Sequence, residues 1–400
     1  MIVYKILFWT SLFIVWYSYI GYGMLLYFLV SIKKLLRKIP NSSSHTYEPN
    51  VSLVVAAYNE EEFIHTKIKN TQELDYPAGK LQVIFITDGS SDATPDIIKQ
   101  SSFELLHQPQ RKGKVAAMNR AIDFVNSEIV VFCDANTLLN RQCIRELVKH
   151  YTDERVGAVA GEKKVLAGAD AKAAGAGEGI YWKYESFLKK LDSELYSVVG
   201  AAGELFSVRT HLFEKAQEDT IIEDFVQSLK VCMKGYVVRY EPRAYATETG
   251  SLSMRDEQKR KVRICAGAFQ AMGMLKGLFN VFKYPVLSFQ FLSHRILRWT
   301  LCPLSLLVLL LSNIPLAWSE GLLTGSGGGW FYSVFLALQS AFYLLAITGW
   351  LFANRNIKLK LLYVPYYFLF MNLSVFLGFF RFLQKRQTVL WEKAARQKTA

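Results

Sequence analysis

The sequence predicts an α/β domain with a mostly parallel sheet, joined at both ends to helices that span a membrane. Two observations predict this fold. Long uncharged apolar runs stand near both ends of the 400-residue chain, and short continuous apolar runs alternate with helix-like stretches in the middle. We expect the following division: 1–32 an N-terminal transmembrane anchor, 48–250 the α/β domain, 251–298 a basic segment with interfacial amphipathic helices, 299–383 three C-terminal membrane segments, and 384–400 a basic tail.

The first apolar run, Ile6–Ser31, contains no charged residue and exceeds the roughly 20 residues needed to cross a bilayer. A cleaved signal peptide does not fit, because the run is long and has neither a basic start nor an Ala-x-Ala-like cleavage site. Three more apolar runs follow near the other end, at about 301–318, 330–353 and 359–382. We therefore expect a multi-pass membrane protein.

The basic residues around these runs predict the orientation. Lys33 and Lys34 follow the first run, Arg298 precedes the second and Arg355 follows the third, whereas the segment between the second and third runs has no Lys or Arg. By the positive-inside tendency, the middle domain is then cytoplasmic, in a plasma (inner) membrane. The side of the C-terminus stays open. Four crossings put the basic tail outside, and Pro365 allows the last run to be re-entrant or broken.

The formal net charge of +13 raises the question of nucleic acid. Many of the basic residues, however, lie beside the membrane runs, where they meet anionic head groups, and no basic–aromatic RNA motif occurs. We expect membrane lipid and no nucleic acid among the partners. The five cysteines form no C-x-x-C pair and no ligand spacing with the six histidines, so neither a disulfide framework nor a zinc site is expected.

Three predicted strands in the middle domain end in polar residues. The run "VSLVVAA" leads to Glu60, "LQVIFIT" leads to Asp88 and Asp92, and "EIVVFC" leads to Asp134 and Asn136. In open α/β sheets, ligands bind beyond the carboxyl ends of the strands. Each acid also has a local explanation, as a helix first-turn acid, an Asx-turn, an N-cap or a strand-end turn. Three such ends in succession favour a binding site.

Two helix starts carry further candidates. In "QRKGKVAA", Lys114 follows a glycine and begins a helix, an arrangement that can seat an anion but lacks the P-loop spacing. A solvated loop is the alternative. Glu223 and Asp224 begin a second helix, where acids either complement the helix dipole or supply a carboxylate that accepts a proton.

A basic run and a small-residue run complete the candidates. The run "QKRKVR" holds Arg260 and Arg263 and precedes an amphipathic, aromatic-rich stretch that suits the membrane interface. Its basic residues suit either lipid head groups or a diphosphate. The Gly/Ala-rich stretch at 167–179 offers no core, and we expect it to form a mobile loop over the site.

The order of these motifs resembles that of the family 2 glycosyltransferases, and more closely their membrane-integrated branch of hyaluronan, poly-N-acetylglucosamine and cellulose synthases. The resemblance covers about residues 48–265. It rests on seven segments in the family's order: "AAYNEEE", "TDGSSDAT", "RKGKVAAMN", "CDANT", "GAAGELFSVR", "IIEDF" with "VVRYEPRAYATE", and "QKRKVR". It implies a GT-A fold, Rossmann-like with a mostly parallel sheet, that binds a nucleotide diphosphate sugar.

The resemblance also implies roles for the donor-site residues. Glu60 and Asp88 would contact the nucleoside, with Asp92 in the same site. Asp134 would stand where a Mg²⁺ or Mn²⁺ ion meets the diphosphate, and Asn136 would replace the usual second Asp as a neutral ligand. The remaining donor contacts, to the departing diphosphate, would come from Lys114, Arg260 and Arg263.

On the acceptor side, the resemblance makes Asp224, beside Glu223, the general base that activates an acceptor hydroxyl. The family's Q-x-x-R-W motif is altered, because "QKRKVR" lacks the Trp, and Lys261 or Arg263 would stand for its Arg. Trp182 and Tyr184 offer other aromatic platforms for the acceptor.

These inferences together predict an inverting membrane glycosyltransferase. It would move a sugar, UDP-linked by expectation, to a growing polysaccharide or a lipid-linked acceptor, with a homodimer or an export partner as possible associates. The alternative is a non-catalytic nucleotide-sugar-binding or export subunit of a polysaccharide secretion complex. The intact Glu223-Asp224 pair favours the enzyme, since an inactive relative would be expected to lose its base.

Overall fold

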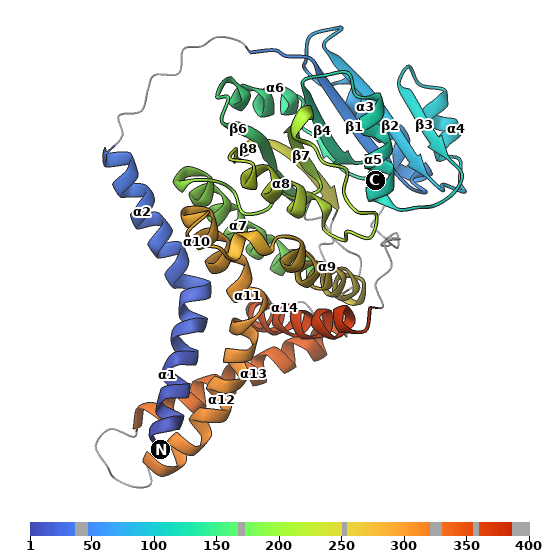
Figure 1. The fold of residues 1–400 in the computed structure, drawn as a ribbon. Coiled ribbons are helices and arrows are strands. Elements are labelled where there is room, and N and C mark those ends of the chain that lie inside the picture. Colours follow the sequence, from blue (N-terminus) through green and yellow to red (C-terminus); the bar gives the residue numbers. More distant parts are fainter. Residues whose placement is uncertain (37–46, 167–172, 250–253, 321–329, 355–359, 386–400) are drawn as a thin grey trace.

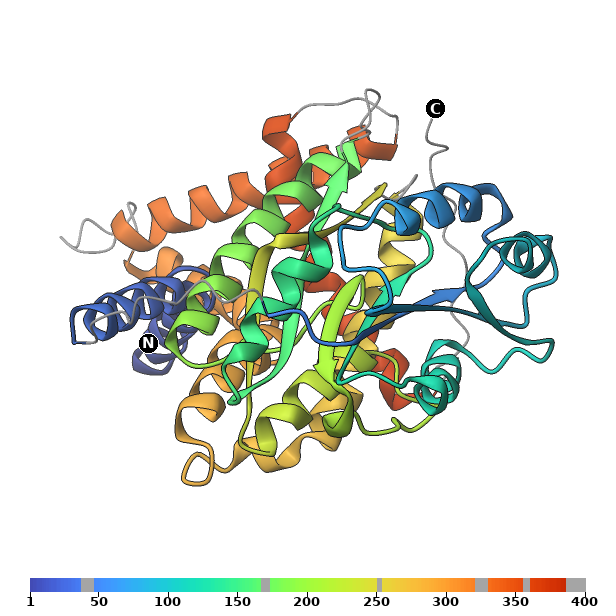
Figure 2. The ribbon, with the colours of Figure 1, turned by 90° about the horizontal axis from the view of Figure 1, so that it is seen from above.

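The computed structural model describes residues 1–36, 47–166, 173–249, 254–320, 330–354 and 360–385. A sheet domain forms one end of the molecule, and long apolar helices extend from it toward the other end (Figure 1). Seen from above, the N-terminal helix and the orange C-terminal helices lie to one side of the sheet, while the last, red helix runs beneath the domain (Figure 2). This division confirms the predicted α/β domain with attached apolar helices.

An eight-stranded mixed sheet, in the order β3-β2-β1-β4-β7-β6-β8-β5, forms the centre of the domain. The first four strands in this order are parallel, β7 is antiparallel to both of its neighbours, and β6 pairs with β8 in parallel. The strands are β1 Val51–Ala57, β2 Leu81–Asp88, β3 Glu104–Gln108, β4 Ile129–Asp134, β5 Leu138–Leu139, β6 Val156–Leu166, β7 Leu205–Arg209 and β8 Val237–Thr249.

Helices cover both faces of the sheet, which explains why β1 is buried along its whole length. Because successive side chains point to opposite faces, Val54 packs on one face with Met118 and Leu229, while Val55 packs on the other with Ile64. Helices α5 Lys114–Ala121, α8 Glu223–Met233, α9 Met254–Met274 and α10 Pro285–Phe291 contribute to the first face, and α3 Glu61–Gln72, α4 Thr94–Lys99 and α6 Cys143–Val148 to the second.

The parallel register brings the predicted polar strand ends together. Ala57, the last residue of β1, lies opposite Thr87 of β2, and Ala56 lies opposite Asp134 of β4. Asp88 and Asp134 therefore end their strands at the same edge of the sheet. This is the edge at which α/β domains bind ligands.

One expectation about the middle of the chain is wrong. From Ala173 onward, the Gly/Ala-rich stretch predicted as a mobile loop belongs to α7, Ala173–Leu195; its first part, 167–172, lies outside the described residues. Alanine is the strongest helix former, so the composition that offers no core is still compatible with a helix. Strands β6 and β7 on either side were not anticipated.

Among the residues that the structure describes, four helices are long and apolar enough to cross a membrane. The first is continuous from Ile2 to Leu36, made of α1 Ile2–Trp16, a π-helical turn at Tyr17–Gly21 and α2 Tyr22–Leu36. The others are α12 Leu301–Glu320, α13 Trp330–Asn354 and α14 Lys360–Leu383, close to the predicted runs. Helix α14 continues through Pro365, so no break occurs there.

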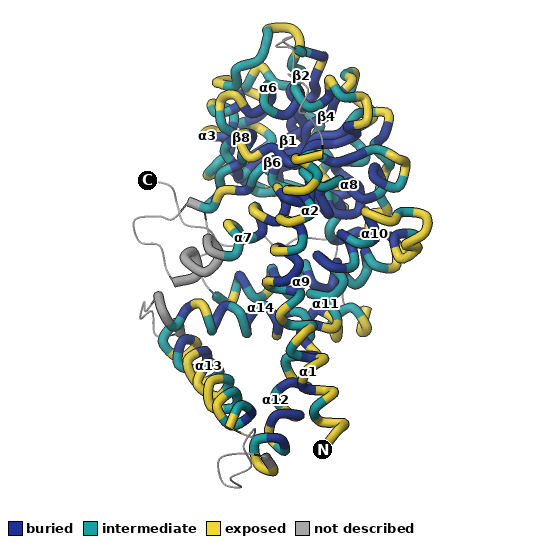
Figure 3. The backbone as a smooth tube through the Cα atoms, turned by 90° about the vertical axis from the view of Figure 1, so that its left-hand side faces the viewer, coloured by how far each residue is buried: buried dark blue, intermediate teal, exposed yellow. Residues whose placement is uncertain are grey.

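These helices do not all run in the same direction. Helices α1 and α12 run side by side and pack together through Phe8 and Leu309, whereas α14 crosses them beneath α9 (Figures 1 and 3). Gly378 of α14 sits so close to α9 that a Cβ there would come within 2.5 Å of Cys265 Cβ. Helix α14 therefore lies between the sheet domain and the pair formed by α1 and α12.

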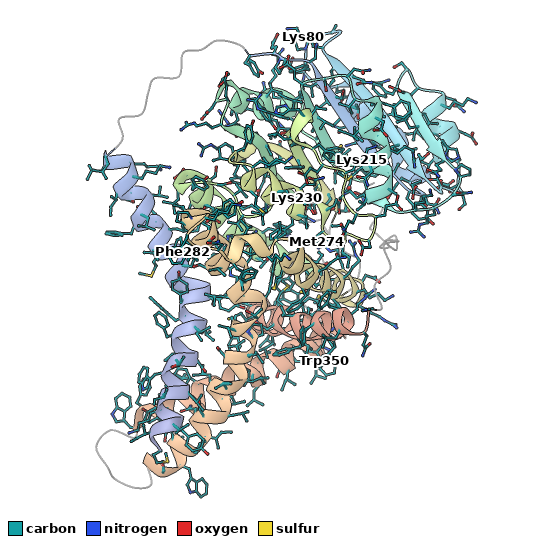
Figure 4. The ribbon with its side chains drawn as sticks, in the orientation of Figure 1. Lys80, Lys215, Lys230, Met274, Phe282 and Trp350 are labelled. Atoms are coloured by element: carbon teal, nitrogen blue, oxygen red, sulfur yellow. The ribbon has the colours of Figure 1, made fainter. Side chains whose placement is uncertain are left out.

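The long apolar helices are widely exposed, most plainly α13 (Figure 3), and many of their exposed residues are large and apolar. Leu338 and Leu344 on this helix are 66% and 64% exposed, and Trp350 is 50% exposed. Trp350 lies among the long helices below the sheet domain, whereas Lys80 and Lys215 lie on the sheet domain (Figure 4). Large apolar surfaces of this kind are rare on soluble proteins, so the chain is a membrane protein.

Candidate active site

A pocket opens at the carboxyl edge of β1 and β2, where Tyr58, Asp88, Arg111 and Gly113 line it. The guanidinium of Arg111 stacks on the Tyr58 ring at 3.8 Å from its centroid. On the pocket floor, Asp88 Oδ2 accepts hydrogen bonds from the backbone N–H groups of Lys112 (2.8 Å) and Gly113 (2.6 Å). The carboxylate therefore holds the loop that carries Arg111.

The other Asp88 oxygen is available to a ligand. Asp88 Oδ1 is buried and has no hydrogen-bond partner within the described part of the chain, although Arg120 lies 3.6 Å away. An acceptor of this kind on a pocket floor suits an N–H group of a nucleobase. The predicted role of Asp88 in nucleoside binding is compatible with this geometry.

Gly89 lets the Arg111 loop approach the strand end. Its φ of +69° is a conformation that L side chains rarely adopt, and a Cβ would stand 2.4 Å from Arg111 Cβ. Any side chain at this position would push the Arg111 loop away from the pocket. Steric contact with Arg111 and the positive φ thus explain why a glycine stands in "TDGSSDAT".

Glu60 and Asp92 lie beside the pocket, not among the residues that line it. The Glu60 N–H donates to Thr94 Oγ1 (2.8 Å), and its carboxylate side chain is buried. The Asp92 carboxylate accepts from the N–H groups of Glu61 (3.2 Å) and Thr94 (3.1 Å). For Asp92, the contact with Thr94, two residues on, matches the Asx-turn alternative, and direct donor contacts by both acids stay predictions.

A charged cluster lies next to the pocket, where β4, α5 and α8 meet. Lys114, the first residue of α5, places Nζ 2.7 Å from Asp134 Oδ1 and 3.2 Å from Glu223 Oε1. Gly203, just before β7, closes the cluster, because a Cβ there would lie 3.1 Å from Lys114 Nζ and 3.4 Å from Asp224 Oδ2. The structure thus brings together the lysine, the strand-end acid and the two helix-start acids predicted from sequence.

Burial and neighbouring charges shift the pKa values of the residues in this cluster. Burial, and then the charge of Glu223, raise the pKa of Asp224 to about 7, which suits a general base at neutral pH. Burial alone would lower the pKa of Lys114, but Asp134 and Glu223 raise it well above its usual range. Burial also raises the pKa of Asp134, against the effect of Lys114; the 2.7 Å contact favours the ionised pair.

The turn after β4 offers two oxygen atoms suited to a divalent cation. Both Asp134 Oδ1 and Asn136 Oδ1 are buried; the first is paired with Lys114 Nζ, and the second has no hydrogen-bond partner in the described ranges. Carboxylate and amide oxygens are the ligands that hard cations prefer. No group of three or more His, Cys, Asp or Glu side chains able to hold a metal occurs among the described residues, so the remaining ligands of an ion would be diphosphate oxygens and water.

The basic residues of α9 have different surroundings. Arg263 is partly buried, and burial lowers its pKa against the charges of Glu223 and Asp224, which places it near the cluster. Arg260 instead pairs with Glu257 at 3.0 Å and lies 3.7 Å from Glu248. Of the two arginines, Arg263 is the one whose position suits a departing diphosphate.

Trp182 and Tyr184 lie on opposite sides of α7, as positions two apart on a helix must. The Tyr184 hydroxyl donates to the Tyr19 carbonyl (2.5 Å) and accepts from Arg298 (3.0 Å), so this ring packs against the N-terminal helix. Trp182 faces the lysines that surround the cluster, with Lys163 Nζ 5.2 Å from its ring centroid. The structure therefore leaves Trp182 as the aromatic candidate and does not bring Tyr184 to the site.

A buried ion-pair network next to the cluster was not predicted. Lys163 of β6 is fully buried and pairs with Glu204 (2.5 Å) and Glu248. Lys163 holds the pKa of Glu204 well below its usual range, although burial opposes this. The charge of Glu204 in turn contributes to the raised pKa of Asp224. The motif "GAAGELFSVR" pointed to Glu204, but no local pattern marks Lys163.

Comparison with known proteins agrees with this geometry. Residues 52–216 match the family model described as Glycosyl transferase family 2. A poly-beta-1,6-N-acetyl-D-glucosamine synthase of Staphylococcus epidermidis is 27% identical over 263 residues, 62% of each chain. A synthase of the same name from Staphylococcus aureus (strain COL) is 26% identical over 270 residues, 64% of this chain and 63% of the relative. The matched segments thus span less than two thirds of these two relatives.

A solved structure shares the whole fold. The mannosyltransferase PcManGT from Pyrobaculum calidifontis, in complex with GDP-Man and Mn²⁺, matches with a TM-score of 0.69 and 21% sequence identity, over 95% of this chain and all of that chain. The fold and site define a GT-A-like transferase domain attached to membrane helices. Within this domain, residues 52–216 match the model of the family 2 glycosyltransferases.

Proposed function

We propose that the protein is an inverting glycosyltransferase that uses a nucleotide diphosphate sugar, with UDP as the expected nucleotide. The observation that carries the proposal is Asp224, a buried carboxylate with a pKa of about 7, next to a Lys114–Asp134 ion pair and a pocket suited to a nucleoside. A site that only bound a nucleotide sugar would have no need for a base tuned to neutral pH.

The reaction is a single displacement. Asp224 accepts the proton of an acceptor hydroxyl as the oxygen attacks the anomeric carbon, and the bond from that carbon to the diphosphate breaks on the opposite face. The new glycosidic bond therefore has inverted configuration. Lys114 and Arg263 stabilise the negative charge that grows on the departing diphosphate.

A Mg²⁺ or Mn²⁺ ion fits the turn after β4. Asp134 and Asn136 would hold it, and when bound it supplies positive charge against the diphosphate oxygens. The Mn²⁺ in the mannosyltransferase of similar fold is consistent with this assignment. Lys114, already paired with Asp134, favours the ionised form of this acid.

We assign the sheet domain to the cytoplasmic face and the acceptor to a growing polysaccharide or a lipid-linked glycan. If α14 lies in the plane of the interface, as its crossing beneath α9 supports, only three helices cross the bilayer. Three crossings place the sheet domain and the basic tail on the same side of the membrane. The basic residues of the tail are then cytoplasmic, as the positive-inside tendency requires, whereas four crossings would put them outside. A cysteine introduced at Lys385 should then react with an impermeant maleimide only after the membrane is opened.

The function is tested with membranes that carry the chain and a panel of radiolabelled UDP- and GDP-sugars, followed by sizing of the product. We expect transfer from a UDP-sugar, and its loss in Asp224→Asn while UDP binding persists. Transfer by the Asp224→Asn variant would disprove the assigned base. The absence of transfer from every donor, with nucleotide binding intact, would favour the non-catalytic subunit instead.

A further inference from the structure

Lys189, on α7, is a buried cation without a counter-ion among the described residues. It is 3% exposed, and within the described part of the chain it makes neither a hydrogen bond nor an ion pair. Its Nζ lies 5.5 Å from the centroid of the Trp182 ring. Burial lowers the pKa of Lys189. A buried ammonium group without a counter-ion raises the free energy of the folded protein, which suggests that an anionic ligand supplies the missing charge.

The carboxylates whose charges reach Lys189 are engaged elsewhere. Two of them pair with other cations and the third accepts hydrogen bonds from hydroxyl groups, and among the described residues none lies within ion-pair distance of Lys189. The pairs are Glu185 with Arg295 (2.6 Å), Glu204 with Lys163 (2.5 Å) and Glu162 with Ser186 (2.6 Å).

Two other ammonium groups lie beside the same aromatic ring, those of Lys163, which pairs with Glu204, and Lys261. Lys261 of α9 is 5% exposed and lies 5.8 Å from the Trp182 centroid, with Glu257 as a loose partner at 3.5 Å. The ammonium groups of Lys189 and Lys261, together with the indole, form a site for an anion attached to a flat apolar or sugar group. The ammonium groups bind the anion, and the ring packs against the remainder of the ligand.

This site lies between the catalytic cluster and the apolar helices. On one side, Lys163 contacts Trp182 and pairs with Glu204, whose charge acts on Asp224. On the other side, Tyr181 packs against Tyr367 of α14, with ring centroids 6.4 Å apart. A ligand held here would have the base on one side and the membrane-facing helices on the other.

We propose that Lys189, Lys261 and Trp182 bind the phosphate group of a membrane-borne acceptor. The inference rests on the proposed function and narrows its acceptor to a molecule that carries phosphate close to a lipid chain. The phosphate oxygens bind the two ammonium groups, and the adjoining sugar or lipid carbon packs against the indole.

The test measures binding of radiolabelled dodecyl phosphate to the full chain in micelles of a neutral detergent. We expect saturable binding, weakened at least tenfold in Lys189→Met. The matched control is Lys190→Met, the exposed neighbour on the same helix, which removes the same charge and should bind as the unmodified chain does. UDP binding, measured on each variant, reports folding. Equal affinity of Lys189→Met and the unmodified chain would overturn the site.

Two further arms separate the sources of phosphate. Inorganic phosphate should compete at least tenfold more weakly than dodecyl phosphate, and equal competition would overturn the membrane-borne acceptor. If Lys189→Met loses UDP binding through misfolding, Lys261→Met, on a different helix, must show the tenfold loss, and unchanged binding there also refutes the proposal. If the chain binds dodecyl phosphate but transfers no sugar, the phosphate site is supported and only the proposed function is refuted.

Discussion

The charge of Glu223 is predicted to set the pH at which the enzyme becomes active. Asp224 is active as a base when it is deprotonated, so activity should rise with pH through about 7. Glu223→Gln removes the neighbouring charge that, after burial, contributes most to the raised pKa of Asp224. The pKa of Asp224 must then fall, and the acid limb of the pH profile moves to lower pH.

The size of the shift follows from the contacts. A neighbouring carboxylate typically moves a pKa by about one unit, or about 1.4 kcal/mol. With a pKa near 6 in place of 7, the deprotonated fraction of Asp224 at pH 6 rises from about one tenth to about one half. Relative to its own plateau, the variant should therefore be about fivefold more active than the unmodified enzyme at pH 6.

The assay is kcat/KM for transfer between pH 5 and 9, with membranes of equal enzyme content. Glu214→Gln is the matched control, because it removes an acid that α8 lysines pair with at the surface, away from the cluster. Its profile should be unchanged. An acid limb in Glu223→Gln that stays at 7 or moves upward would show that Asp224 is not the titrating base, or that Glu223 is not its neighbour in the working enzyme.

Three other changes test other parts of the site. Asp134→Ala should abolish Mn²⁺-dependent UDP binding, measured by calorimetry with and without the ion; unchanged binding would refute the metal site. Gly89→Ala should lower UDP affinity and destabilise the domain by about 1–3 kcal/mol, read from thermal unfolding, because of its positive φ and the Arg111 clash. Lys163→Met should destabilise by about 3–5 kcal/mol, since Glu204 and Glu248 are left buried without their partner; an unchanged melting temperature would contradict this account.

Local patterns were sufficient for the framework of the catalytic edge. Continuous apolar runs predicted β1, β2 and β4, and the acids that end them lie on one edge because parallel strands share a direction. The helix that begins at Glu223 was also visible, since its apolar positions recur with helical spacing and a glycine follows it. For the same reason, the apolar runs near both chain ends predicted the four long helices.

Pairing between distant segments decided the rest. Nothing in the local sequence of β6 indicates that Lys163 is buried, because its partners Glu204 and Glu248 lie 41 and 85 residues further along the chain. Helix α7 gives a second example. The sequence predicted Trp182 and Tyr184 in one acceptor site, but in the helix the two side chains lie on opposite faces. A motif can indicate which residue types a reaction needs. Which charges remain unpaired, such as Lys189, depends on the balance of neighbours that only the packed chain brings within reach, because electrostatic contacts act through space and not along the sequence.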